Sequence, residues 1–341
     1  MGKETSKQEK LLELKHLYVE YSSNLETVKA VNDVELSLER GATLGLVGET
    51  GAGKTSIARA ILRILPDPPA KVPQGEIFFE GEDLQKISEA EMRKIRGAKI
   101  SMIFQDPMTA LNPVLTVGKQ ISEAIKLHKG ISKEESIKEA KKMLEMVGIP
   151  GERYEEYPHQ FSGGMKQRVV IAIALACSPH LLIADEPTTA LDVTIQAQVL
   201  NLIKALQQSQ KMAMILITHD FGIVAETCDY VAVIYAGQIV EYGTAEQLFG
   251  NKVHPYTRGL FGSIPKLTGD VERLHSIDGM PPDPTNLPQG CYFSPRCKYA
   301  DECCKKDMTV PLCDVGDGHL CRCLKAEQMA KEGYTGEKSE G

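Results

Sequence analysis

The sequence predicts an α/β protein with a mostly parallel sheet, because short apolar runs alternate with helical patterns along most of the chain. Three such runs, Leu181–Ala184, Met214–Ile217 and Tyr230–Ile234, are typical of buried strands. A fourth, Thr43–Val47, leads into a glycine-rich loop, and a helical pattern at Ser56–Leu65 follows that loop. We therefore expect a core sheet whose strands are separated in sequence by helices.

Length, charge and composition narrow the class of protein. At 341 residues the chain is longer than one typical domain, so two are expected. The net charge of −7 argues against a nucleic-acid binder, which usually carries a basic face. No run approaches the roughly 20 apolar residues of a membrane span, and the charged N-terminus lacks a secretory signal. The cytoplasm is therefore the expected compartment.

Weaker patterns indicate how the chain is organised. Val34, Leu36 and Leu38 alternate with polar residues, which favours a strand, and Ile100–Phe104 is another short apolar strand. We expect a first domain at residues 1–250, a smaller one rich in Pro, Gly and Cys at 251–325, and a frayed polar tail at 326–341.

Residues 112–162 are predicted to form a helical insert within the first domain. Ser132 and Glu135 have the spacing of a capping box at a helix start. Gly148 is a helix stop signal. The helical face between them is formed by Ile137, Ala140, Leu144 and Val147.

Residues 48–55 satisfy the pattern of a phosphate-binding loop (P-loop), with the required strand before it and helix after it. The glycines let backbone N–H groups approach phosphates, and the N-terminus of the helix favours negative charge. Lys54 is expected to contact the β- and γ-phosphates of ATP, and the Thr55 hydroxyl to hold Mg²⁺. The predicted nucleotide-binding residues of this segment are Gly48, Glu49, Thr50, Gly51, Ala52, Gly53, Lys54, Thr55 and Ser56.

Two carboxylates end the buried strand at Leu181–Ala184. Asp185 is expected to act on Mg²⁺, and Glu186 to orient or deprotonate the water that attacks the γ-phosphate. Phosphoryl transfer needs chiefly positioning and charge stabilisation, so this acidic pair suffices as the catalytic complement of the P-loop.

A Ser-Gly-Gly segment lies between the P-loop and the acidic pair. At this segment the chain resembles the ATP-binding cassette (ABC) ATPases, whose signature motif matches Phe161, Ser162, Gly163, Gly164 and Met165. The resemblance implies a RecA-like P-loop core with an N-terminal antiparallel β subdomain and a helical signature subdomain. It also implies that the signature motif contacts the ATP of a second subunit, since the segment opens a helix suited to anions.

The same resemblance implies roles for four further residues. Gln105 looks like the Q-loop glutamine, a Mg²⁺ ligand together with Thr55 and Asp185. His219 resembles the switch histidine that contacts the γ-phosphate, and Asp192 resembles the D-loop aspartate that communicates between two sites. Tyr21 is either the aromatic residue that stacks on adenine or an ordinary strand tyrosine.

Residues 104–113, 254–257 and 281–296 closely resemble segments of oligopeptide and dipeptide importer ATPases. This resemblance implies a subunit that powers peptide import from the cytoplasmic face of a bacterial or archaeal membrane. The implied partners are a second ATPase, identical or paralogous, two membrane permeases and an extracytoplasmic solute-binding protein. Related importers carry nickel, glutathione or oligosaccharides, so these solutes stay open. A soluble ABC ATPase is disfavoured by the single cassette and the absence of sustained heptads.

Seven of the nine cysteines lie between Cys291 and Cys323, which in a cytosolic chain suggests metal rather than disulfides. Four thiolates can bind either Zn²⁺ or a [4Fe–4S] cluster. The spacings are wider than the pairs typical of structural zinc, which favours iron–sulfur. The resemblance to peptide importer ATPases implies the ligand set Cys291, Cys297, Cys304 and Cys323, with Cys303 a possible substitute for Cys304.

Overall fold

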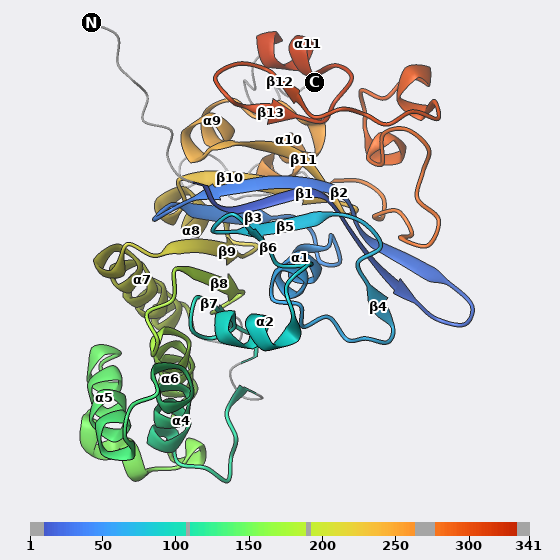
Figure 1. Cartoon of the computed structure of the whole chain (residues 1–341). Helices are drawn as coiled ribbons and strands as arrows, with labels where there is room; N and C mark the ends of the chain where they lie inside the picture. The colour runs from blue at the N-terminus through green and yellow to red at the C-terminus, as the bar shows by residue number, and fades with distance from the viewer. Residues whose placement is uncertain (1–9, 107–109, 189–191, 263–276, 333–341) are drawn as a thin grey trace, which may run out of the picture. The chain divides into compact units, whose positions relative to one another are not determined.

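The computed structural model describes residues 10–106, 110–188, 192–262 and 277–332 (Figure 1). The chain divides into two compact units, each assembled from three segments. The insert unit comprises Met1–Leu12, Leu38–Thr43 and Phe79–Thr218. The loop unit comprises Glu13–Ser37, Leu44–Phe78 and His219–Gly341. Within the described ranges, no helix is both long and apolar enough to span a membrane.

Three parallel strands form the core of the insert unit. β8 (Leu181–Asp185) pairs with β7 (Ile100–Ile103) on one side and β9 (Ala213–Ile217) on the other. Every residue of these strands is buried, as their unbroken apolar runs predict. The unit also contains β6 (Glu82–Asp83), α2 (Glu89–Ile95), α6 (Gly163–Leu175) and α7 (Val193–Gln210).

The predicted insert is helical. It contains α4 (Val117–Lys129), α5 (Lys133–Met146) and two short 3₁₀ helices, η1 (Gly151–Glu155) and η2 (Pro158–Gln160). The capping box is confirmed: Ser132 Oγ accepts from Glu135 N, and Glu135 Oε2 accepts from Ser132 N. Of the predicted apolar face, Ala140, Leu144 and Val147 are buried, whereas Ile137 is only partly buried.

The N-terminal part of the loop unit is antiparallel. β1 (Lys10–Ser22) lies between β2 (Thr27–Glu39) and β5 (Glu76–Phe79), and β4 (Ala70–Lys71) pairs antiparallel with β1. Val34, Leu36 and Leu38 are all buried on one face of β2, as their alternation predicts.

A second group of strands in the loop unit extends to the C-terminal segment. β3 (Thr43–Val47) pairs parallel with β10 (Tyr230–Tyr235), and antiparallel pairing then runs through β11 (Gln238–Thr244), β13 (Leu320–Cys321) and β12 (Cys313–Asp314). In Figure 1 the red strands β12 and β13 continue the sheet beyond yellow β11. The helices are α1 (Lys54–Ile61), α8 (Phe221–Thr227), α9 (Ala245–Gly250), α10 (Pro255–Gly262), η3 (Ser294–Arg296), η4 (Glu302–Lys305) and α11 (Ala326–Glu332).

Three sequence-based boundaries need correction. α1 begins at Lys54 rather than Ser56 and ends at Ile61 rather than Leu65. Residues 326–332 are not a frayed tail but a helix, whose Ala326 and Met329 are buried against Val253 and Cys321. The break expected near Gly250 does not separate the two units, because β13 pairs with β11 across it.

Candidate nucleotide-binding site and cysteine cavity

The glycines of the P-loop have backbone conformations that other residues cannot adopt. Gly48 has a φ of 154°, and a Cβ there would lie 2.2 Å from the carbonyl oxygen of Ile234. Gly53 has a φ of 105°, and its Cβ would lie 2.3 Å from the carbonyl oxygen of Ala30. Contacts below 3 Å with backbone atoms cannot be relieved by side-chain movement, so both positions require glycine.

Lys54 is the first residue of α1, with Gly53 at the N-cap. Its side chain is buried, and its ammonium donates to the carbonyl oxygens of Gly48 at 2.7 Å and Glu49 at 2.9 Å. The ammonium group therefore lies inside the curve of the loop that the motif assigns to phosphates. Thr55 and Ser56 follow on α1, and both are half-buried.

Tyr21 lies on β1 beside the start of α1. Its hydroxyl is 3.1 Å from Ser56 Oγ, and its Cα is paired with Ala70 of β4. The aromatic ring is thus held near the P-loop helix, as a residue that contacts the nucleotide would require.

In the insert unit, three predicted catalytic residues lie close together. Asp185 ends β8 and is buried, and the following Glu186 donates its backbone N–H to the carbonyl of Ile217 at 2.9 Å. The amide of Gln105, just beyond the end of β7, donates to Glu186 Oε2 at 2.7 Å. Glu186 has a φ of 46°, a left-handed conformation that is uncommon for glutamate and frequent at functional sites.

The signature segment begins α6 as predicted. Ser162 is the N-cap, and its Oγ accepts from Met165 N at 3.4 Å. Gly163 is exposed, and a Cβ on Gly164 would lie 2.7 Å from Ile195 Cγ2. Phe161 is buried beneath the Arg153 guanidinium, which lies 4.3 Å from its ring centroid. An exposed helix N-terminus flanked by glycines can accept an anion from outside the chain.

His219 and Asp192 are both exposed. His219 follows β9 and precedes Asp220, the N-cap of α8. Asp192 is the N-cap residue of α7. Residues 107–109 of the Q-loop segment and 189–191 before Asp192 lie outside the described residues.

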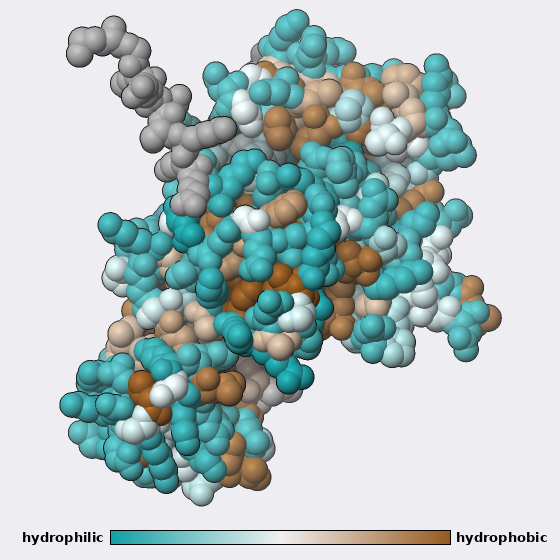
Figure 2. All heavy atoms as spheres, in the orientation of Figure 1, coloured by the Kyte–Doolittle hydropathy of each residue, from teal (hydrophilic) through white to brown (hydrophobic). Residues whose placement is uncertain are grey.

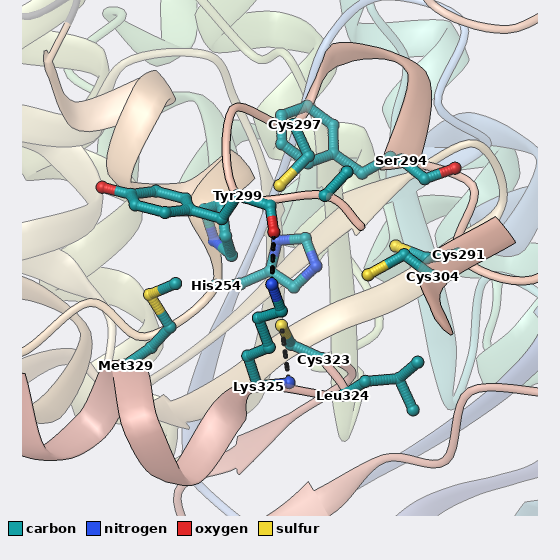
Figure 3. Close-up of a pocket in the computed structure, with 13 residues that line it drawn as sticks. His254, Cys291, Ser294, Cys297, Tyr299, Cys304, Cys323, Leu324, Lys325 and Met329 are labelled. Carbon is teal, nitrogen blue, oxygen red and sulfur yellow. Dashed lines mark hydrogen bonds between the residues drawn. The ribbon is translucent and has the colours of Figure 1, made fainter. Parts of the chain in front are cut away.

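The C-terminal segment places four cysteines around one cavity (Figure 3). The lining includes Cys291, Cys297, Cys304 and Cys323, the four residues predicted as a ligand set. They come from the loop around η3, from η4 and from the second residue after β13. The rest of the lining includes His254, Phe293, Tyr299 and Met329.

The other cysteines of this segment lie outside that lining. Cys303 turns away and donates its thiol hydrogen to Asp301 Oδ1 at 2.7 Å. Asp301, Cys303 and Cys304 also place ligand atoms within 4.8 Å of one another, a second potential metal group that shares Cys304. Cys313 is exposed and pairs with buried Cys321 across β12 and β13.

Burial raises the pKa values of three of the thiols that line the cavity. It raises the pKa of Cys291 to about 11, and it also raises the pKa values of Cys297 and Cys323 above their usual value. These groups are therefore neutral thiols at pH 7 unless a cation binds to them.

Sequence reasoning missed two sets of contacts. Arg296 and Tyr256 both hydrogen-bond to Glu49 of the P-loop, although they are more than 200 residues away in sequence. The carboxylate of Glu241 is fully buried and accepts from the backbone N–H groups of Val253 and His254 and from His319 Nε2. No local pattern signals such contacts, since each partner is an isolated polar residue in its own segment.

Comparisons with known proteins agree with this geometry. A family model described as ABC transporter matches residues 31–189, and one described as oligopeptide/dipeptide transporter, C-terminal region, matches residues 240–304. A solved ATP-binding cassette dimer in a post-hydrolysis state, bound to ADP and Pi, has a TM-score of 0.62 and 27% identity, covering 69% of this chain and 98% of that chain. Fold and site together define an ABC-type ATPase.

Two curated relatives refine the assignment. The dipeptide transport ATP-binding protein DppD of Bacillus subtilis (strain 168) is 50% identical over 326 residues, covering 95% of this chain and 97% of that protein. The oligopeptide transport ATP-binding protein OppD of Haemophilus influenzae is 49% identical over 322 residues, covering 94% of this chain and 98% of that protein. The chain belongs to the ABC transporter family, in the group of oligopeptide and dipeptide transport ATP-binding proteins.

Proposed function

We propose that this chain is the ATP-hydrolysing subunit that powers import of di- and oligopeptides across the cytoplasmic membrane. The observation that supports this most strongly is the near full-length similarity to two peptide-transport ATP-binding proteins. It includes the C-terminal region, which a bare ATPase cassette does not need. Nickel, glutathione and oligosaccharides are the alternative solutes.

The predicted site residues divide the chemistry between them. Lys54 and the P-loop backbone would bind the ATP phosphates, while Thr55, Gln105 and Asp185 supply the oxygen ligands that Mg²⁺ prefers. Mg²⁺, when bound, neutralises phosphate charge. Glu186 would orient or deprotonate the attacking water, and His219 would contact the γ-phosphate. The hydrogen bond between Gln105 and Glu186 supports a coupled role for those two residues.

The signature segment implies that two ATPase subunits act together. Its exposed helix N-terminus would contact the ATP held by the P-loop of a second subunit, identical or paralogous. Asp192 would communicate between the two sites. The solved relative that resembles this chain is itself a dimer, which supports this arrangement.

The insert unit offers a surface for the membrane permeases. Phe104, Val114 and Tyr157 are large apolar residues that are 42%, 75% and 41% exposed, and all lie in or next to the helical insert. Figure 2 shows a mostly hydrophilic face on which brown hydrophobic side chains are scattered over the helices of the insert. Single exposed apolar residues are common on protein surfaces, so the main support for docking is the similarity to transport ATP-binding proteins. We propose that two permeases dock here, at the cytoplasmic face of the membrane, and that an extracytoplasmic binding protein delivers the solute.

The cysteine cavity fits an iron–sulfur cluster by its donor set. A [4Fe–4S] cluster requires four thiolates, and Cys291, Cys297, Cys304 and Cys323 all line one cavity. Cys303 is less suitable than Cys304, since both thiols donate to Asp301 Oδ1 but only Cys304 lines the cavity. We therefore propose a [4Fe–4S] cluster on these four cysteines, where it would cross-link the segment and could accept an electron. Zn²⁺ is the alternative.

Transport can be tested in the source cells. Deletion of the gene should abolish uptake of radiolabelled di- and tripeptides, and wild-type protein but not E186Q should restore it. Uptake of nickel, glutathione and an oligosaccharide should be unchanged. Loss of one of these in place of peptide uptake would contradict the peptide assignment, while loss of none would contradict an importer role.

Metal content can be tested independently of transport. Protein purified without oxygen should contain about four irons and four acid-labile sulfides per chain. C297S should lose the iron, whereas C313S, a matched change at an exposed cysteine, should keep it. About one zinc per chain, or no metal at all, would contradict the cluster.

A further inference from the structure

Glu49, the second residue of the P-loop, is held through three of its groups. Its carboxylate accepts two hydrogen bonds from Arg296, Nη1 to Oε2 at 2.9 Å and Nη2 to Oε1 at 3.1 Å. Its backbone N–H donates to Tyr256 Oη at 3.0 Å, and its carbonyl accepts from Lys54 Nζ at 2.9 Å. The C-terminal segment thus contacts the residue that directly follows the first glycine of the loop.

Arg296 and Tyr256 are both held in place by further contacts of their own. The Arg296 side chain is only 5% exposed, and its guanidinium also donates to the carbonyls of Asp278 at 3.0 Å and Ile277 at 3.3 Å. Tyr256 is fully buried, with ring centroids of Tyr235 at 4.5 Å and Phe293 at 5.4 Å. Both donor and acceptor are therefore oriented by their own surroundings, and a two-pronged arginine–carboxylate pair adds geometric specificity.

The negative charge of Glu49 means that its pairing with Arg296 affects phosphate binding. A carboxylate on a phosphate-binding loop repels the phosphates it is meant to bind, unless a cation neutralises it. The Glu49 side chain is 27% exposed, so solvent screens it only in part. Arg296 supplies the compensating charge at the carboxylate, while the loop's own lysine binds the Glu49 carbonyl.

We propose that Arg296 and Tyr256 are positioning residues for nucleotide binding. They fix Glu49, and with it the P-loop, and Arg296 cancels a carboxylate charge that would otherwise weaken the binding of a nucleoside triphosphate. This inference rests on the proposed function only in that the P-loop binds ATP. Since Arg296 lies on η3 between Cys291 and Cys297, nucleotide affinity and the order of the cysteine loop are coupled, and by linkage the coupling is reciprocal.

Calorimetry with Mg-ATP on the full chain tests the inference through four variants. R296M should bind Mg-ATP about tenfold or more weakly, because it leaves the Glu49 carboxylate unpaired. Because Glu49 is itself a predicted nucleotide contact, E49Q serves as the reference for the double variant. E49Q/R296M should bind within about threefold of E49Q, since neither has an unpaired carboxylate. Y256F should weaken binding by a smaller factor. In phosphate-release assays R296M should raise the KM for ATP with little change in kcat.

Arg322 provides the matched control. It is an equally buried arginine of the same unit, and it donates to the carbonyls of Ile239 and Val310 and pairs with Asp33. R322M should lower thermal stability without a selective loss of affinity. Where R296M is not soluble, R296K tests the same point, since it keeps the positive charge but loses the two parallel hydrogen bonds of the guanidinium. The loss of Mg-ATP affinity caused by R296K should disappear in the E49Q background.

The outcomes are separable from those of the proposed function. Failure of wild-type protein to bind Mg-ATP would contradict the function itself. Normal binding by folded R296M would overturn the inference alone. An equal loss of affinity when R296M is added to wild type and to E49Q would also overturn it, because arginine would then act on the fold and not through Glu49.

Discussion

The P-loop and the cysteine cavity both belong to the loop unit, yet they are specified in different ways. The P-loop occupies eight consecutive residues, and its glycines are fixed by local φ values and by close backbone neighbours. The cavity draws its lining from residues 254 to 329, and the segment is attached to the sheet through Glu241 and β13. The difference teaches that a contiguous motif encodes its own shape, whereas a cavity depends on pairings between distant residues.

The largest effect is expected at Glu186, a residue whose role a contiguous sequence motif predicts. E186Q keeps the shape and the left-handed backbone but removes the base, so phosphate release should fall about 10²- to 10⁴-fold. Mg-ATP should still bind, and the ATP-bound dimer should be stabilised. Single-turnover phosphate release with radiolabelled ATP measures this effect. Hydrolysis near the wild-type rate would remove Glu186 from the mechanism.

The next effect is expected at Lys54, the charge inside the P-loop. K54A removes an ammonium that donates to two loop carbonyls and is expected to contact phosphate. Mg-ATP affinity should fall about 10- to 100-fold, the value of one charge-assisted interaction. Calorimetry is the direct measurement, since the chain has no tryptophan to report binding. Unchanged affinity would mean that the loop backbone alone binds the phosphates.

A third effect is expected at Glu241, which attaches the segment that contains the cysteine cavity. E241Q places an amide where a fully buried carboxylate accepts from two backbone N–H groups and His319. An amide group offers one acceptor oxygen fewer, so a buried donor loses its partner. The free energy of unfolding should fall by about 1–3 kcal/mol, and the C-terminal segment should be affected first. Hydrogen exchange of residues 313–332 should rise while the P-loop stays protected. Uniform exchange across the loop unit would show that the two regions unfold together.

The smallest effect is expected at Glu80, a carboxylate of the insert unit that serves as a reference. Burial would raise its pKa, but hydrogen bonds from Lys99, Arg40 and His180 outweigh burial and lower the pKa to about 2. A depressed carboxyl pKa stabilises the fold above the unfolded value of 4.5, and this stabilisation is lost as pH falls toward 2.

The ion pairs of Glu80 are partly exposed, and such pairs stabilise the folded state by about 1 kcal/mol or less. E80Q should therefore be slightly less stable than wild type in denaturant titrations at pH 7, and the difference should shrink below about pH 4.5. A difference that persists unchanged at pH 3 would mean that Glu80 acts through packing and not through its charge.

Most of the fold could be predicted from the sequence because its strands are short, apolar and bounded. The α/β fold and the ABC family were predicted and are confirmed, and β3 begins and ends where its pattern indicates. The start of α1 was missed by two residues, because glycine at an N-cap is a weaker helix signal than Ser, Thr, Asn or Asp. The helix at residues 326–332 was missed because only Ala326 and Met329 of its apolar face are buried.

In the candidate site, too, local motifs could be predicted from the sequence, whereas contacts between distant residues could not. Gln105 and Glu186 were predicted separately, and the structure joins them by one hydrogen bond. Arg296 lies in a stretch that was noted only for its resemblance, and its partner Glu49 was predicted as a nucleotide contact. Nothing in either segment indicates the other, because a pair separated by 247 positions is set by tertiary packing alone.

The left-handed backbone at Glu186 also limits how this protein can be stabilised. Glycine or asparagine suits a φ of 46° better than glutamate does, by about 1 kcal/mol. In the proposed mechanism, however, residue 186 needs a side chain long enough to reach a water molecule. A search for more thermostable variants would therefore favour replacement of Glu186, and the variants it recovered would hold ATP without hydrolysing it. Position 186 is thus a point at which selection for stability and selection for turnover oppose one another.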